Sequence, residues 1–264
     1  MKLLTLNCHS WQEENQIEKI SYIAKVINEK EYDAIALQEV SQLICSDIAY
    51  DNVKANNFAL LLQDELKKLF HTLVSNSRHP VLIKTRIGYD ENHKNVLDVI
   101  KIAAEEGVAG VAIHGRTKTQ LYGGNVNYDI ISEAKKINLL PIIANGNISL
   151  NNISEVEKIT NADGYMFGRE ALGHPTIFSN LILKEKGYPI IDDNIEQQTN
   201  FLIEHFNNLK KEFGIDTAIS LIRGVGPFYF KGLQDASIYK SSIIKISSEK
   251  DFFDLMNQIK KLNK

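Results

Sequence analysis

The stretch that most constrains the fold of this chain runs from residue 141 to residue 175. It holds two short apolar runs, Pro141–Ala144 and Tyr165–Phe167, and a glycine-containing turn follows each run. Between them, apolar residues recur at helical spacing: Ile153, Val156 and Ile159. This pattern predicts a strand–turn–helix–strand–turn unit. Because the strands of such a unit are parallel, both turns lie at the same edge of the sheet.

The two turns, Asn145-Gly146-Asn147 and Gly168-Arg169, have features of an anion site. Glycine lets the backbone approach a ligand closely, and free amide groups at a turn before a helix attract negative charge. In an eightfold βα barrel, the loops after the last two strands are the usual place for a phosphate. The alternative is two ordinary turns with glycine caps, and this stretch alone does not decide between them.

Strands and helices alternate through most of the chain, which argues for a parallel α/β sheet. The pattern predicts further strands at residues 3–7, 33–37, 80–88 and 110–113. We expect one helix to begin at Asp90 and to end at Gly107, and another to cover residues 130–137. In the last seventy residues, one apolar helical face is formed by Leu202, His205 or Phe206, Leu209 and Phe213.

The first seventy residues resemble the start of the endonuclease/exonuclease/phosphatase family. There, a first strand ends in an asparagine, like Asn7 in LTLNCH, and a second ends in a pair like Gln38-Glu39 in IALQEV. The resemblance implies that Glu39 holds a magnesium ion, since such oxygen ligands suit a hard cation. The family's later catalytic segments have no counterpart here, so a polar residue at a strand end explains Glu39 more readily.

Four later segments are similar to the second half of the tRNA-dihydrouridine synthases, in that family's order and approximate spacing. They are PVLIKTRIGYDEN, GVAIHGRTKTQLYGG, PIIANGNI and GYMFGREALGHPTIF. Residues 196–264 also resemble its C-terminal helical domain, where Arg223 and Tyr229–Leu233 match a segment linked to tRNA. The resemblance covers about residues 75–264, and four motifs in register make it specific.

This resemblance implies a flavoprotein that uses FMN, with NADPH as reductant, to convert uridine in tRNA to dihydrouridine. The implied cofactor-binding residues are Lys84, His114, Asn145, Gly146, Asn147, Gly168 and Arg169. A fixed cation at Lys84 would stabilise the negative charge of reduced flavin. The implied contacts to substrate RNA are Arg116, Thr117, Arg223 and Lys231.

Plainer explanations stand beside three of these assignments. Lys84 also fits a lysine at a barrel rim whose stem covers apolar surface. His114 also fits a core histidine that the backbone satisfies, and Arg169 fits a surface residue where a helix begins. The shared order of the four motifs favours the site over these alternatives.

The family's catalytic cysteine lies in a Gly-Cys-Pro turn, and the sequence contains no such turn. Cys8 is a weak candidate because it follows a strand end, and Cys45 is weaker still. We therefore predict that the catalytic acid is missing and that activity is impaired. The two cysteines give no disulfide framework and no metal signature, and free thiols fit a cytoplasmic protein.

The predicted fold class is α/β: an incomplete TIM-type (β/α) barrel of parallel strands, followed by a small C-terminal helical domain. The predicted parts are residues 1–74, 75–190 and 191–264. Because the first part resembles one family and the other two resemble another, the chain is predicted to be chimeric or truncated. An incomplete barrel exposes sheet edges, which predicts self-association.

Net charge is −3, so any RNA contact has to be local, as in residues 201–264 with ten Lys or Arg against seven Asp or Glu. No apolar run approaches the roughly 18 residues of a membrane span, and we expect tRNA, not a membrane, as partner. Two other functions stay open: a Mg-dependent phosphodiesterase or phosphatase, and a non-catalytic RNA-binding remnant.

Overall fold

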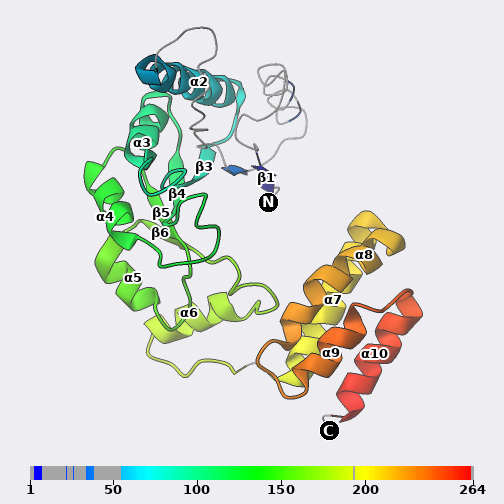
Figure 1. The fold of residues 1–264 in the computed structure, drawn as a ribbon. Helices are drawn as coiled ribbons and strands as arrows, with labels where there is room; N and C mark the ends of the chain where they lie inside the picture. The colour runs from blue at the N-terminus through cyan, green and yellow to red at the C-terminus, as the bar shows by residue number, and fades with distance from the viewer. Residues whose placement is uncertain are drawn as a thin grey trace. The chain divides into compact units, whose positions relative to one another are not determined.

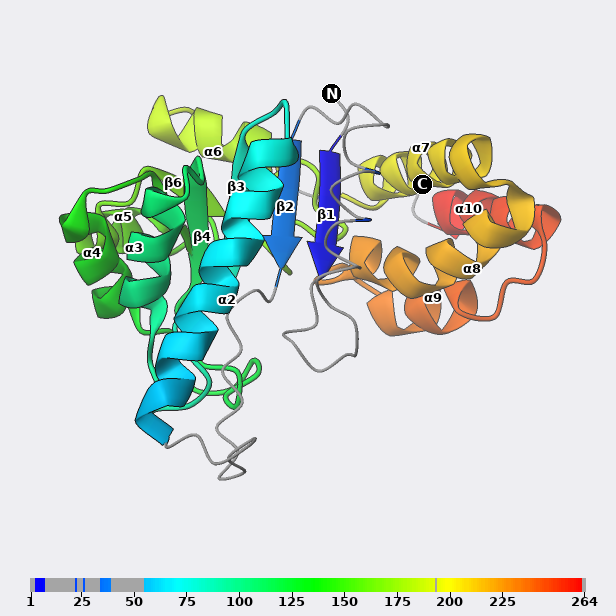
Figure 2. The same ribbon diagram turned by 90° about the horizontal axis from the view of Figure 1, so that it is seen from above.

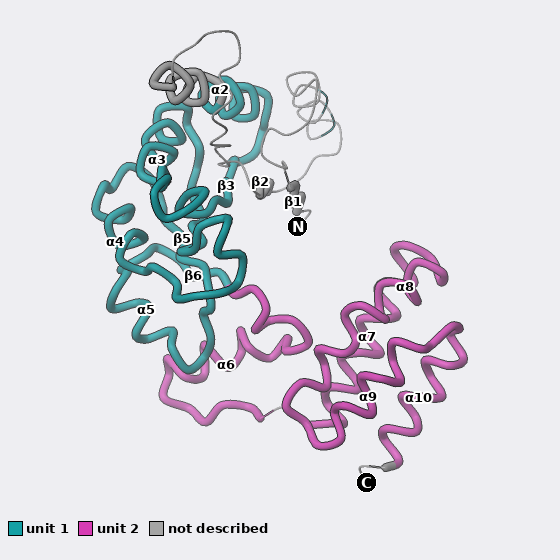
Figure 3. Tube along the Cα trace, in the orientation of Figure 1, with its two compact units in different colours: residues 1–166 teal, residues 167–264 magenta. Residues whose placement is uncertain are grey.

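The computed structural model describes residues 3–7, 22, 26, 34–38, 55–192 and 194–262. The chain divides into two compact units, Met1–Met166 and Phe167–Lys264 (Figure 3). The first unit contains the sheet, and the second contains the C-terminal helices. The division falls before the predicted boundary at residues 190/191, and the predicted three-part organisation stays a prediction.

The sheet has six strands in the order β1-β2-β3-β4-β5-β6, and every neighbouring pair is parallel. The strands are β1 (Leu3–Asn7), β2 (Ala34–Gln38), β3 (Val81–Arg86), β4 (Gly110–His114), β5 (Ile142–Asn145) and β6 (Gly164–Met166). Spatial order that follows chain order is the winding of a βα barrel, whereas a doubly wound sheet reverses it. The six strands found among the described residues, in this order, confirm the predicted incomplete barrel.

Four helices of the first unit follow one another along one side of the sheet (Figures 1 and 2). They are α2 (Ala55–Asn76), α3 (Val96–Glu105), α4 (Tyr128–Ile137) and α5 (Ile153–Thr160). Side chains alternate in burial along β3: Val81, Ile83 and Thr85 are buried, while Leu82, Lys84 and Arg86 are half-buried. Since successive residues of a strand face opposite ways, the buried set forms the helix-covered outer face, and the other set forms the inner face.

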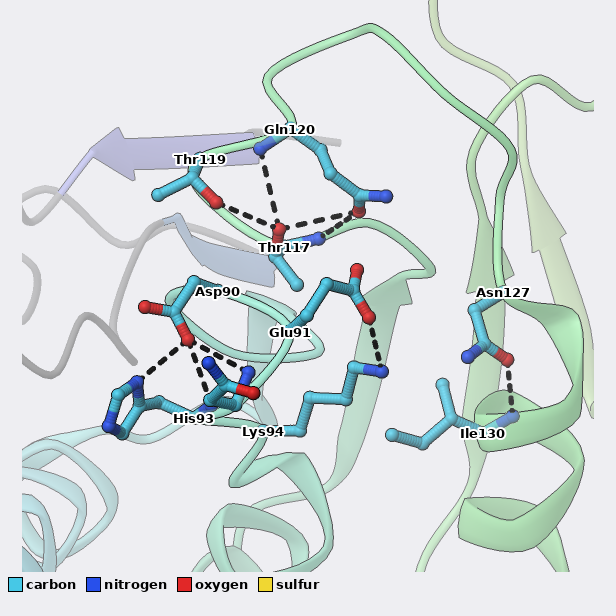
Figure 4. A network of polar contacts seen from close by, with 10 residues as sticks. Asp90, Glu91, His93, Lys94, Thr117, Thr119, Gln120, Asn127 and Ile130 are labelled. Carbon is cyan, nitrogen blue, oxygen red and sulfur yellow. Dashed lines mark hydrogen bonds and ion pairs between the residues drawn. The ribbon is translucent and has the colours of Figure 1, made fainter.

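The prediction that a helix begins at Asp90 is wrong. The Asp90 carboxylate instead accepts hydrogen bonds from the backbone amides of Asn92 and His93, both at 3.0 Å, and closes a turn (Figure 4). Gly88 then forms an antiparallel bridge with Lys94, and α3 begins only at Val96. Aspartate competes with a helix in this way because its side chain bonds the backbone two and three residues on.

The second unit is helical, and its last five elements enclose a core of aliphatic and aromatic side chains. Its elements are α6 (Ile177–Glu185), α7 (Ile195–Phe213), α8 (Ile215–Val225), η3 (Gly226–Phe230), α9 (Ala236–Ile243) and α10 (Glu249–Leu262). Leu202 and Phe206 of the predicted α7 face are fully buried, whereas Phe213 at its end is exposed. Among the helices described, none is long and apolar enough to cross a membrane.

Candidate functional site

The strand register places four predicted or neighbouring polar residues on the inner face of the sheet. Arg86 pairs with His114, and His114 pairs with Asn145, so their side chains form one row at the carboxyl ends of the strands. Lys84 pairs with Ala112, two residues before His114, and therefore lies on the same face one step lower. The register therefore places Lys84, His114 and Asn145 on one face, and the prediction that they bind one flavin together with Arg169 stays a prediction.

Two cations lie on this face of the described strands β3 to β6. Strands β3 to β6 contribute two cations, Lys84 and Arg86, and contain no Asp or Glu. His114 and Asn145 are buried, with exposed fractions of 5% and 8%. An ammonium, a guanidinium, an imidazole and an amide form a donor set that suits an anionic ligand with several hydrogen-bond acceptors.

The turn after β5 is held in place by its neighbours. The amide Nδ2 of Asn145 donates to the Met166 carbonyl at 2.8 Å, which fixes the plane of this side chain. Gly146 has a φ of +121°, and a Cβ there would lie 2.8 Å from Cδ2 of His114, so only glycine lets the imidazole lie against the turn. The Tyr128 hydroxyl donates to the Gly146 carbonyl at 2.6 Å.

Tyr128 and Asn147 also contribute to the structure of this turn. Burial raises the pKa of Tyr128, while the nearby charge of Arg116 acts in the opposite direction. The hydroxyl therefore stays protonated at neutral pH and keeps its bond to the Gly146 carbonyl. Asn147 continues the turn with a φ of +51°, and its carbonyl accepts a bond from the Asn152 side chain at 2.8 Å.

Arg116 and Thr117, the predicted RNA contacts of this unit, are both buried, with exposed fractions of 5% and 0%. The Arg116 guanidinium donates to the carbonyls of Gly123 and Gly124 at 2.9 to 3.2 Å. The Thr117 amide donates to the Gln120 side chain at 2.8 Å (Figure 4). Both residues thus hold the loop after β4 together, and a direct contact with RNA stays a prediction.

Arg86 is a member of the site that the sequence prediction did not assign. Its Nη1 donates to the carbonyls of Thr117 and Leu121 at 3.0 and 2.9 Å, and its guanidinium lies 5.9 Å from the centre of the Tyr122 ring. The available signal was the alternation of β3, because a residue two positions after Lys84 shares its face. Its bonds to a loop more than thirty residues away had no such signal.

The remaining predicted cofactor and RNA residues belong to the second unit. Gly168 has no heavy atom within 4 Å of the place a Cβ would take, and Arg169 follows it. Lys231 is exposed and lies 3.7 Å from the Glu170 carboxylate, and Arg223 is exposed near the end of α8. A common site formed by both predicted turns stays a prediction.

Three weakly assigned residues, Cys8, Glu39 and Cys45, lie outside the described residues. Asn7 is the last residue of β1, as expected from the sequence. Where side chains are described, no group of three or more His, Cys, Asp or Glu residues is arranged to hold a metal ion. The role of Glu39 as a magnesium ligand stays a prediction.

A histidine in the second unit gives a pH-dependent prediction. The Nδ1 of His205 lies 2.9 Å from the hydroxyl of Tyr229, and burial lowers the pKa of His205. The unfolded chain therefore binds a proton more readily than the folded chain, so this stability is complete above the ordinary value of about 6.5 and is lost as pH falls below it.

We expect the free energy of unfolding of the helical unit to fall between about pH 7 and pH 5, because burial disfavours the charged imidazolium form of His205 in the folded chain. Urea unfolding followed by far-ultraviolet circular dichroism measures this. The matched variant His205→Gln keeps a polar side chain without this titration and should show a weaker pH dependence. Equal pH dependence in both proteins would contradict the assignment to His205.

Solved structures similar to this chain include two of particular interest. The old yellow enzyme homologue from Zymomonas mobilis is 14% identical, with a TM-score of 0.47, over 69% of this chain and 54% of that one. An endonuclease/exonuclease/phosphatase family protein from Leptotrichia buccalis is 44% identical over 30% of this chain and 27% of that one, with a TM-score of 0.18.

Curated relatives give a stronger match. The tRNA-dihydrouridine synthase B of Pasteurella multocida is 30% identical over 218 residues, which are 79% of this chain and 66% of that protein. A probable tRNA-dihydrouridine synthase of Rickettsia prowazekii is 32% identical over 192 residues, 70% of this chain and 58% of that protein. This chain therefore spans about six-tenths of the length of these relatives.

The model of one protein family, described as dihydrouridine synthase (Dus), matches residues 54–263. This range includes strands β3 to β6, with the inner-face row, and the helical unit as far as the end of α10. It begins at residue 54, within the first seventy residues that resemble the endonuclease/exonuclease/phosphatase family. The chain belongs to the dihydrouridine synthase family.

Proposed function

We propose that this chain is an FMN-binding protein of the dihydrouridine-synthase type, which acts on uridine in tRNA with NADPH as reductant and with impaired activity. The observation that carries the proposal is the cationic inner-face row, in which Lys84 lies one step below Arg86, His114 and Asn145. A flavin nucleotide is anionic and rich in acceptors, so this donor set fits it.

The first unit would hold the flavin ring through Lys84, His114, Asn145, Gly146 and Asn147. FMN, when bound, supplies a carrier that passes hydride from the reductant to the substrate base. The protein's own part is to place charges and shape: Lys84 supplies a cation, and Asn145 presents an amide whose plane is fixed by the Met166 carbonyl. Such preorganised groups stabilise developing negative charge without reorganising.

Within the second unit, Gly168 and Arg169 are the proposed contacts to a phosphate, and Arg223 and Lys231 are the proposed contacts to RNA. Gly168 and Arg169 lie in a turn with open space beside the glycine, which leaves room for a phosphate near the backbone. Arg223 and Lys231 are exposed cations that can follow a phosphate backbone. Binding to tRNA through them should weaken as salt rises, because counterions are released from the RNA.

The impairment follows from the missing acid. A Gly-Cys-Pro turn is absent from the given sequence, and the inner-face row contains no cysteine. We therefore expect NADPH to reduce the bound flavin readily, while little or no dihydrouridine is formed.

The test is an FMN titration of the purified protein, followed by addition of NADPH and then of unmodified tRNA. We expect a bound-flavin absorbance band near roughly 450 nm that NADPH bleaches, with little dihydrouridine formed. Absence of flavin binding would overturn the proposal. Magnesium-dependent cleavage of a phosphodiester in its place would establish the phosphodiesterase alternative.

A further inference from the structure

The loop between β6 and α6 rests directly on the helical segment η3. Gly173 in this loop has a φ of +75°, and a Cβ there would lie 2.3 Å from the carbonyl carbon of Phe228 and 2.5 Å from the Tyr229 amide nitrogen. Real Cβ atoms do not approach a backbone so closely. The loop backbone and the Phe228–Tyr229 peptide are therefore packed against each other, with no room for a side chain between them.

An ion pair joins the same two segments a second time. The carboxylate of Glu170, three residues before Gly173, lies 3.7 Å from the ammonium group of Lys231, which follows η3. Both side chains are about half exposed, so the pair contributes little stability by itself. The ion pair does place Lys231, a predicted RNA contact, beside the loop that contains Arg169.

The segment η3 is in turn built into the core of the helical unit. Tyr229 bonds to His205 of α7, and the ring of Phe230 packs 5.4 Å from that of Tyr239 in α9. A Cβ on Gly226 would lie 2.5 Å from the Ile243 side chain. A segment held on several sides moves only with its unit, so a loop seated on it is expected to be ordered by the same unit.

We infer that η3 positions residues 168–173, the loop that contains Arg169. This loop and the predicted RNA contacts Arg223 and Lys231 then form one cooperative element. Gly173 and Glu170 are the positioning residues. Resting on the proposed function, this inference adds that cofactor-phosphate binding and tRNA binding strengthen each other. Such coupling is reciprocal, because each ligand favours the same ordered arrangement.

Amide hydrogen exchange of the unmodified protein tests the inference without any flavin. The loop amides of Ala171 and His174 are hydrogen-bonded within the loop, at 3.0 and 3.2 Å, and so report on its opening. We expect added tRNA to slow exchange at residues 168–176 together with residues 226–233. Protection of the helical segment that leaves the loop unchanged would overturn the inference, whether or not FMN binds.

A glycine pair supplies matched variants for the coupling itself. Gly173→Ala adds a Cβ that clashes with η3, whereas Gly187→Ala adds one at a similar φ of +71° with no heavy atom within 4 Å. Both variants bear the cost of a left-handed residue, so their difference isolates the contact with η3. Far-ultraviolet circular dichroism checks that each variant is folded.

In the unmodified protein and in Gly187→Ala, we expect tRNA to tighten FMN binding by about 5-fold or more, and FMN to tighten tRNA binding by the same factor. In Gly173→Ala, both ligands still bind but the factor falls toward one. Equal coupling in both variants, or none in the unmodified protein, would refute the inference while leaving flavin binding intact. Lack of flavin binding would instead count against the proposed function.

Discussion

Phe206→Ala is expected to lower the free energy of unfolding of the helical unit by about 3–5 kcal/mol, as for other fully buried aromatic side chains. Phe206 has no exposed surface, and its ring stacks on that of Phe252 with centres 4.1 Å apart. A second contact joins it to the edge of Phe253 at 5.9 Å. Removing the ring leaves a cavity between α7 and α10 that neither helix can fill without moving.

Amide hydrogen exchange in α7 and α10 measures this loss in the complete chain, since it reports the opening of each segment separately. The control is Phe213→Ala on the same helix, where the ring is 57% exposed and truncation should change stability by less than about 1 kcal/mol. Similar losses in the two variants would show that the described core does not stabilise this unit. Weakened tRNA binding in Phe206→Ala alone is the expected functional consequence.

Local patterns in the sequence predicted the strands of the sheet but not the structure of its loops. The alternation of β3 and the apolar runs before His114 and Asn145 predicted strands within one or two residues, because strand period and turn glycines are local signals. Parallel pairing then brought the strand ends to one edge. The helix predicted from Asp90 failed because its carboxylate bonds to nearby amides and so competes with helical bonds.

Contacts between distant segments could not be predicted in this way. The resemblance implied that Arg116 contacts substrate RNA, whereas in the structure Arg116 is buried and donates to the carbonyls of Gly123 and Gly124. Likewise, no pattern in residues 168–176 predicts their contact with Phe228, which lies more than fifty residues further along the chain. The glycines in these loops indicated that the backbone is closely approached there, but not by which residues.

The row on the inner face of the sheet gives the second large effect, on ligand affinity. Lys84→Ala is expected to raise the dissociation constant for FMN by roughly 10- to 100-fold, the usual loss when one partner of a charge-assisted hydrogen bond is removed. Lys84 is half-buried on the face opposite the helices, so its truncation should leave the packed outer face, with Ile83 and Thr85, undisturbed.

The matched control is Lys101→Ala, which removes the same charge from an exposed position on α3 where Lys101 lies 3.3 Å from Asp98. Fluorescence titration with FMN should give an unchanged dissociation constant for this variant. Equal affinity in the two variants would mean that Lys84 is a rim lysine and not a flavin ligand. A lost affinity in Lys84→Ala alone would also predict a lower reduction potential for the flavin that still binds, because a nearby cation favours the negatively charged reduced form.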